Sequence, residues 1–263
     1  IISTVAWGLG YFGMPHILLR FMAIEDEKKL KLSRRVATIW VVISLFVAVF
    51  IGVIGYTMSK VGALEMLTGS NSETIIVKIS ALLSQHGVIF ALLAGVILAG
   101  ILASTMSTSD SQLLAASSAV SSDILGAFRK DSSNKNGSMA AARITLLVIS
   151  VVAAFIARNP DSSVFAIVSF AWAGFGAAFG PVVLFSLFWK RTNKWGALAG
   201  MVCGGSMVFI WKYLIRPLGG IWNIYELLPA FLIACAAIVI VSLLTPKPSK
   251  EIEEEFDRVA QMK

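Results

Sequence analysis

Charged residues are scarce in this 263-residue sequence, at 14% of the chain, whereas soluble proteins carry about a quarter. Histidine is scarcer still, with only His16 and His86, so the sequence has no histidine cluster of the kind that holds zinc or haem. The two cysteines, Cys203 and Cys235, lie within apolar runs and do not indicate a redox compartment. There is also no P-loop, zinc-protease motif or Ser/His/Asp set, and these absences argue against an enzyme.

Apolar residues, in contrast, are abundant. They make up 57% of the chain and the mean hydropathy is +0.82, values typical of an integral membrane protein. With about twenty residues per crossing, the sequence predicts an all-α protein with seven membrane spans, near residues 1–23, 36–58, 87–108, 140–157, 163–188, 197–215 and 227–245. Residue 1 is an isoleucine inside the first apolar run, so we expect the chain to be the C-terminal portion of a longer protein.

The net charge of +7 comes largely from lysines and arginines between the spans, which is the positive-inside pattern of membrane proteins. If the basic connection 24–35 is cytoplasmic, 17 of the 22 Lys and Arg residues lie inside and 5 lie outside. We therefore expect a multi-pass protein of the cell membrane, surrounded by lipid bilayer, with a cytoplasmic C-terminus. No basic stretch alternates with aromatic residues, so no nucleic-acid partner is indicated.

The stretch WGLGYFGMPH, from Trp7 to His16, interrupts the first apolar run with three glycines and a proline. Glycine weakens helical hydrogen bonding and proline removes a donor, and lipid offers no substitute partner. Such a break is tolerated where the freed backbone groups face protein, water or a ligand, so we predict a discontinuous helix that lines a binding site. The glycines also spell G-x-G-x-x-G, but the membrane-apolar flanks and the lack of a βαβ pattern argue against a dinucleotide site.

Small hydroxyl residues recur along the third span. Ser104, Ser107, Thr108 and Ser111 are spaced i, i+3, i+4 and i+7, which places them on one face of a helix. Hydroxyl and carbonyl oxygens suit a hard cation such as sodium. Alternatively, the small residues permit close helix packing while the hydroxyls bond back to carbonyls one turn earlier. The spacing alone leaves both interpretations open.

The connection between the second and third spans is long and lies on the predicted outer side. Within it, Thr74 to Gln85 has apolar residues at helical spacing. This pattern predicts an amphipathic helix on the outer surface, acting either as a lid or as a cap on the helix bundle.

Three motifs together resemble the solute:sodium symporter family, and within it the proline-transporting branch. They are WGLGYFGMPHILLRFMA (7–23), GILASTMSTSDSQLLAASSA (100–119) and WAGFGAAFGPVVLFSLFWKRTNKWGALAGMVCG (172–204), and the resemblance extends over nearly the whole chain. It implies a LeuT-like 5+5 core of two inverted five-helix repeats. Residues 1–188 would form the second repeat, 189–245 two peripheral helices and 246–263 a cytoplasmic tail, while the missing N-terminal half would supply the first repeat.

The resemblance also implies residue roles. Ser107 and Thr108 match hydroxyl ligands of the transported sodium ion, and Ser104 matches a position that offers its backbone carbonyl. Trp7, Tyr11 and Pro15 match residues that bind the substrate. Trp7 and Tyr11 are spaced i, i+4 and so share a helix face; without the resemblance they would be read as interfacial aromatics.

We therefore expect a sodium-coupled secondary symporter that imports a small organic solute by alternating access, with L-proline as the first candidate. One alternative is a symporter of the same fold for another solute, such as pantothenate, a sugar or a carboxylate, because Met14 stands where the proline branch carries glutamine. A second alternative, from a different class, is a membrane sensor or binding subunit that does not transport.

Overall fold

The first apolar segment does not form a continuous helix. In the computed structural model, which describes residues 2–26, 28–125, 135–158 and 163–261, this segment consists of helix α1 (Ile2–Ala6), the 3-10 helix η1 (Trp7–Gly13) and helix α2 (Pro15–Met22). Met14, between η1 and α2, is extended, with φ −83° and ψ 112°. The predicted discontinuous helix is therefore confirmed.

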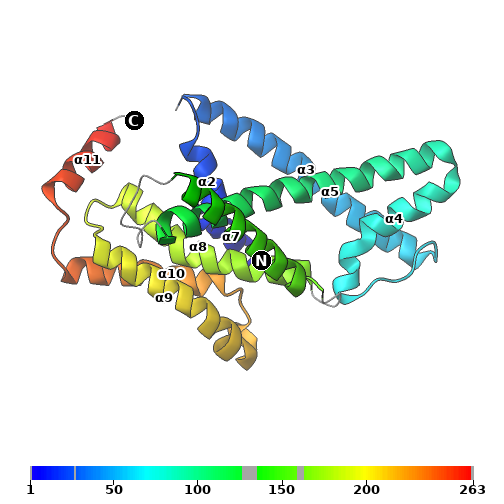
Figure 1. The fold of residues 1–263 in the computed structure, drawn as a ribbon. Coiled ribbons are helices and arrows are strands. Elements are labelled where there is room, and N and C mark those ends of the chain that lie inside the picture. Colours follow the sequence, from blue (N-terminus) through cyan, green and yellow to red (C-terminus); the bar gives the residue numbers. More distant parts are fainter. Residues whose placement is uncertain (1, 27, 126–134, 159–162, 262–263) are drawn as a thin grey trace. The chain divides into compact units, whose positions relative to one another are not determined.

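The other predicted spans are long apolar helices (Figure 1), and six stretches of the described residues are long and apolar enough to cross a membrane. The helices are α3 (Lys29–Lys60), α5 (Val88–Ser118), α7 (Lys135–Ile156), α8 (Val164–Phe188), α9 (Lys194–Ile210) and α10 (Leu227–Leu244). A π-helical turn extends α5 as η4 (Ala119–Ile124), and another extends α9 as η5 (Trp211–Ile215). Because no strand occurs within the described ranges, the protein is all-α there. The 5+5 arrangement and the domain boundaries stay predictions.

The basic connection predicted over residues 24–35 is partly helical, because α3 already begins at Lys29. Lysine and arginine are good helix formers, so nothing in their chemistry ends the helix at the membrane surface. At 1.5 Å per residue, the 32 residues of α3 reach about 48 Å, well beyond a hydrocarbon core of about 30 Å. Its basic first turns can therefore lie in the headgroup region while the apolar remainder crosses.

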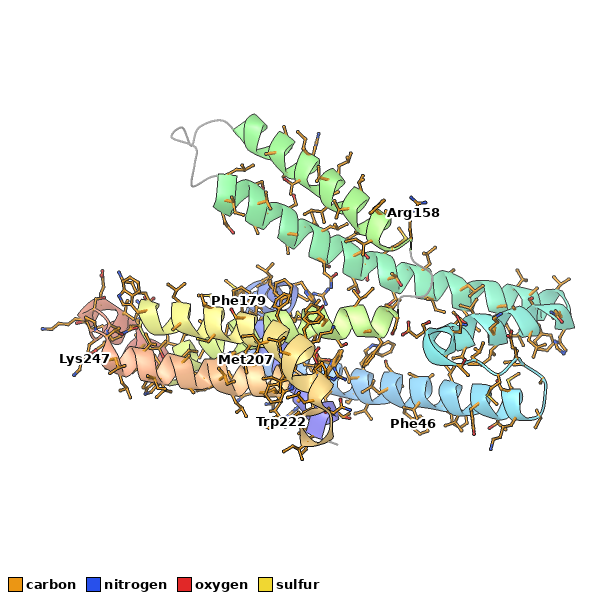
Figure 2. All side chains as sticks on the ribbon, turned by 90° about the horizontal axis from the view of Figure 1, so that it is seen from below. Phe46, Arg158, Phe179, Met207, Trp222 and Lys247 are labelled. Carbon is orange, nitrogen blue, oxygen red and sulfur yellow. The ribbon has the colours of Figure 1, made fainter. Side chains whose placement is uncertain are left out.

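The chain divides into two compact units, of which the first comprises the residues up to Met22 and those from Phe165 onwards. In this unit α9 and α10 run side by side (Figure 1). Glycine permits this close approach, because a Cβ atom at Gly200 would lie 2.4 Å from Cγ1 of Ile238. Figure 2 shows Trp222 and Lys247 at opposite ends of this helix pair. The charged tail, predicted as a solvated end, is helical as α11 (Lys250–Gln261).

The second unit runs from Ala23 to Val164 and contains the predicted surface helix. This helix, α4 (Ile75–Leu83), lies between the short helices η2 (Gly69–Thr74) and η3 (Ser84–His86). It packs on α3 where Gly55 leaves room, since a Cβ atom there would lie 2.2 Å from Cγ1 of Ile75. Helix α7 packs along α5 (Figure 1), and the Ser117 hydroxyl donates to the Ala142 carbonyl at 2.8 Å. Within the short link between the predicted spans 140–157 and 163–188, residues 159–162 lie outside the described residues.

Candidate functional site

The interruption in the first segment is filled by aromatic side chains of the same unit. The Trp7 indole stacks on Phe165 at 5.5 Å and on Trp172 at 5.4 Å between ring centroids, with interplanar angles of 12° and 13°. Tyr11 meets Trp172 edge-to-face at 4.8 Å. Trp7 and Tyr11, predicted to share a face, are thus brought together around one indole. Stacked and edge-on pairs of this kind each stabilise their arrangement by about 0.5–1.5 kcal/mol.

A hydrogen bond fixes this aromatic cluster to the interrupted backbone. The Trp172 indole N–H donates to the Trp7 carbonyl at 3.0 Å. Trp7 is the first residue of η1, where the change from α-helical to 3-10 geometry alters the regular hydrogen-bond pattern. The indole of α8 therefore supplies a protein partner at the position where lipid would supply none.

Glycines bring η1 and α8 into backbone contact. A Cβ atom at Gly10 would lie 1.9 Å from the Trp172 Nε1 atom, and one at Gly13 would lie 2.3 Å from the Phe175 carbonyl oxygen. On α8, a Cβ atom at Gly176 would lie 2.7 Å from the Gly10 Cα atom. Gly8, in contrast, has open space around its Cβ position. Two of the three glycines of the G-x-G-x-x-G sequence are thus needed for close helix packing.

Pro15 is the first residue of α2, where a proline costs no helical hydrogen bond. Its ring is exposed, and so is half of the Tyr11 side chain. Met14 is buried, and its carbonyl accepts from the N–H groups of Ile17 and Leu18, both at 3.0 Å. Trp7, Tyr11 and Pro15 are therefore located within one interrupted segment that combines aromatic rings with a non-helical backbone.

The three residues predicted to bind sodium also lie together, in the second unit on α5. The Ser107 hydroxyl donates to the Ser104 carbonyl at 3.1 Å, and the Thr108 hydroxyl donates to the same oxygen at 3.2 Å. Elsewhere on the helix, Thr105 and Ser109 hydroxyls each bond to a different carbonyl, those of Ile101 and Thr105. Convergence on one oxygen thus distinguishes Ser104, Ser107 and Thr108 from their neighbours.

The chemistry of this oxygen cluster suits a hard monovalent cation. Carbonyl and hydroxyl oxygens are the ligands that hard cations prefer, while nitrogen and sulfur ligands select transition metals. Among the described residues, no group of three or more His, Cys, Asp or Glu side chains is placed to hold a metal ion. The hydrogen bonds to Ser104 equally match the interpretation in which the hydroxyls satisfy themselves within the helix. The aromatic site and the oxygen cluster belong to separate units and are two sites of one chain.

The structure adds aromatic residues that sequence reasoning missed. Trp172 and Phe165 of α8 complete the wall around Trp7, and Tyr225 stacks on the same indole at 5.8 Å and 16°. Trp172 opens the glycine-rich stretch WAGFG, which the sequence marks only as a place of close packing. Tyr225 lies more than 200 residues after Trp7 in the sequence, and no sequence pattern connects the two. Burial and the nearby Glu226 carboxylate both raise the pKa of the Tyr225 phenol, so the phenol stays a hydrogen-bond donor.

The short connection between α8 and α9 is a polar junction with the end of α10. Asn193 accepts from the Gly196 N–H at 2.8 Å, which caps α9, and its amide donates to the Thr245 hydroxyl at 2.7 Å. Nearby, Lys190 pairs with Asp257 of α11, and this hydrogen bond raises the pKa of the Lys190 ammonium group. The junction therefore connects the start of α9 and the end of α10, which lie at one end of the helix pair, to the tail.

Comparison with known sequences extends the resemblance beyond the three motifs. The sequence model of the sodium:solute symporter family matches residues 1–204. The chain is 41% identical to a sodium/proline symporter of Salmonella typhimurium over 257 residues, 97% of this chain and 49% of that protein. It is 40% identical to the osmoregulated proline transporter OpuE of Bacillus subtilis and 39% identical to a sodium/proline symporter of Escherichia coli, covering 49% of each. The chain thus spans about half the length of these relatives. No solved structure matches it.

Proposed function

This chain belongs to the sodium:solute symporter family, and from that premise we propose that the protein containing it is a sodium-coupled symporter that imports L-proline. The family and the curated relatives are transporters, and the chain has the membrane-spanning helices that such a protein requires. The solute crosses the membrane without chemical conversion. The observation that carries the proposal is the interrupted first segment, whose non-helical backbone lies beside the Trp7 and Tyr11 rings.

The chemistry of the interrupted segment fits a small zwitterion with an apolar ring. The extended backbone at Met14 breaks the helix, and broken helices in other transporters bind the charged ends of a solute. Tyr11, half exposed, offers an aromatic face and a hydroxyl. On this basis we assign substrate contact to Trp7, Tyr11 and Pro15. Trp172 stacks on Trp7 and meets Tyr11 edge-to-face, and it thereby holds both rings in place.

Sodium is the second transported species, and we assign its ligands in this chain to the Ser104 carbonyl and the Ser107 and Thr108 hydroxyls. One positive charge that crosses 100 mV contributes about 2.3 kcal/mol. This free energy corresponds to roughly fortyfold accumulation of solute at equilibrium, before any sodium concentration gradient is counted. The mechanism is alternating access, in which sodium favours the state that binds solute from outside.

The excess of lysine and arginine on one side of the membrane supports a multi-pass protein of the plasma membrane with its C-terminus in the cytoplasm. In this orientation the polar junction around Asn193 and the tail helix α11 are cytoplasmic, and α4 is external.

Uptake of labelled proline into proteoliposomes that hold the full-length protein tests the proposal. We expect uptake to follow an inward sodium gradient, and Ser107→Ala and Thr108→Ala to raise the sodium concentration for half-maximal uptake at least tenfold. Ser109→Ala is the matched control, because Ser109 lies on the same helix but bonds to a different carbonyl. Uptake that ignores the sodium gradient contradicts the coupling, and equal effects of Ser107→Ala and Ser109→Ala contradict the sodium assignment.

The same assay separates the two alternatives. Competition by pantothenate, a sugar or a carboxylate that is stronger than competition by unlabelled proline identifies a symporter for another solute. Thermal stabilisation by proline in the absence of any flux identifies a binding subunit or sensor.

A further inference from the structure

The connection between α9 and α10 folds back onto the interrupted first segment. After η5 it forms two short 3-10 turns, η6 (Arg216–Leu218) and η7 (Gly220–Trp222). The chain reverses between them at Gly219 and Gly220, whose φ angles of 75° and 58° favour glycine. This reversal leads to Tyr225 and Glu226, which are both buried although they precede the membrane helix α10.

Tyr225 joins three elements of the first unit. Its ring stacks on the Trp7 indole, its hydroxyl donates to the Ser169 carbonyl of α8 at 2.6 Å, and its backbone N–H donates to the Ser3 hydroxyl of α1 at 3.1 Å. A residue that only filled space would not need a hydroxyl bond and a backbone bond to two different helices. Tyr225 thus contacts both α1 and Trp7, the first residue of η1.

An ion pair with one buried partner holds the backbone beside Tyr225. The Glu226 side chain is 2% exposed, and the guanidinium of Arg216, whose side chain is 42% exposed, donates to its carboxylate at 3.0 Å. The same guanidinium donates to the Asn223 side-chain oxygen at 3.2 Å. A carboxylate this deeply buried is stable only with a partner of opposite charge. The pair therefore fixes both ends of the reversal that presents Tyr225.

We propose that Tyr225 is a positioning residue for Trp7 of the substrate wall, held in place by the Arg216–Glu226 ion pair. The connection between the two helices predicted to be peripheral then sets the orientation of an indole in the solute site. Tyr225 acts through Trp7 and does not itself touch the solute. The role in solute affinity rests on the proposed function, while the positioning of Trp7 does not.

Fluorine NMR of the full-length protein labelled with 5-fluorotryptophan tests the positioning. The Trp7 resonance is assigned as the signal lost in Trp7→Phe. We expect Tyr225→Phe, which keeps the ring but loses the bond to Ser169, to shift or broaden this resonance, and Glu226→Gln to do so in the same direction. Tyr213→Phe is the matched control, since Tyr213 lies in η5, its side chain is exposed, and its ring packs edge-to-face on Phe170 rather than on Trp7. A Trp7 resonance in Tyr225→Phe that is unchanged from the wild type overturns the proposal.

Uptake kinetics of the same variants give the consequence for transport. Tyr225→Phe removes the hydrogen bond to Ser169 that helps to orient Trp7, and we expect the KM for proline to rise about fivefold. We expect kcat to stay within about twofold of the wild type. A general folding defect would instead lower kcat with the amount of active protein. If Tyr225→Phe shifts the Trp7 resonance but leaves the KM for proline unchanged, the role of Tyr225 in solute affinity is overturned. Absence of proline uptake by the wild type overturns the proposed function and leaves the NMR result to decide the positioning.

Discussion

The packing of η1 on α8 can be tested by two glycine substitutions that differ only in the space around them. Gly8 and Gly10 lie two residues apart in the same 3-10 helix, and neither has a positive φ. Alanine is therefore compatible with the backbone at both positions, and any gain from a less flexible unfolded chain is common to both. A Cβ atom at Gly8 meets nothing within 4 Å, while one at Gly10 would lie 1.9 Å from the Trp172 Nε1 atom.

The destabilisation that we expect from Gly10→Ala follows from the contacts that the Trp172 indole would lose. A displaced Trp172 loses its 3.0 Å hydrogen bond to the Trp7 carbonyl, which contributes about 1 kcal/mol, and its stacking on Trp7, which contributes about 0.5–1.5 kcal/mol. If the indole stays, overpacking itself costs about 1–3 kcal/mol. Because the indole either moves or stays, these costs are alternatives, and we expect Gly10→Ala to destabilise the packed segment by about 1–3 kcal/mol. This corresponds to a factor of roughly 5 to 150 in the equilibrium between the packed and the displaced segment.

The assay compares Gly8→Ala and Gly10→Ala with the wild type in the full-length protein, by thermal unfolding in detergent and by uptake in proteoliposomes. We expect Gly10→Ala to melt earlier than Gly8→Ala and to lose most proline uptake. Gly10→Ala with the melting temperature and uptake of the wild type would refute the reasoning, because then the indole does not occupy the space beside Gly10.

Two further predictions concern other contacts. Gly204→Ala should destabilise the protein by about 2 kcal/mol because its Cβ atom would lie 2.2 Å from the Ala177 carbonyl, whereas Gly205→Ala meets only a methyl group at 3.9 Å and should be neutral; equal melting temperatures of the two variants would contradict this. The raised pKa of Lys190 means that its pairing with Asp257 stabilises the tail contact fully below the ordinary lysine value of 10.5 and is lost as the pH rises through the raised pKa. NMR titration of the lysine side chains should show the Lys190 midpoint fall in Asp257→Asn, and an unmoved midpoint would exclude the pairing.

Much of the fold follows from composition and local pattern. Long apolar runs predict membrane helices because a helix pairs its own backbone groups where lipid offers no partner. Helices α8 and α10 begin and end within a few residues of the predicted limits, whereas α5 begins as predicted but continues to Ser118, ten residues beyond the predicted end. The break at Gly8 to Pro15 is predictable for the same reason, since glycine and proline act on the hydrogen bonds of their own helix. The start of α3 at Lys29 was not predictable from hydropathy, because hydropathy identifies only the part of a helix that crosses the bilayer and not the part that continues into water.

The aromatic site shows where sequence reasoning stops. Trp7 and Tyr11 are identified by their spacing on one segment, but their partner Trp172 comes from a helix more than 150 residues away. Tyr225 is further still, and its burial depends on a reversal at two glycines and on an ion pair between residues ten apart. Contacts of this kind depend on tertiary packing, for which a single sequence has no periodic signal. Gly10 and Gly176 in the sequence indicate close helix packing, but the sequence does not show which residues they pack against.

The hydrogen bonds of the oxygen cluster on α5 are compatible with both interpretations that the spacing left open. Within the helix the Ser104 carbonyl also accepts from the backbone N–H four residues later, so three donors compete for an oxygen with two lone pairs. The hydroxyls of Ser107 and Thr108 are therefore held more weakly than a hydroxyl that shares its carbonyl with the backbone N–H alone, such as that of Ser109. Each hydroxyl retains acceptor lone pairs for a cation, and a cation at this place relieves the competition because both protons can turn away. Bonding back to the helix is then the resting arrangement of the ligands that we assign to sodium, and the two interpretations describe the same three residues with and without the ion.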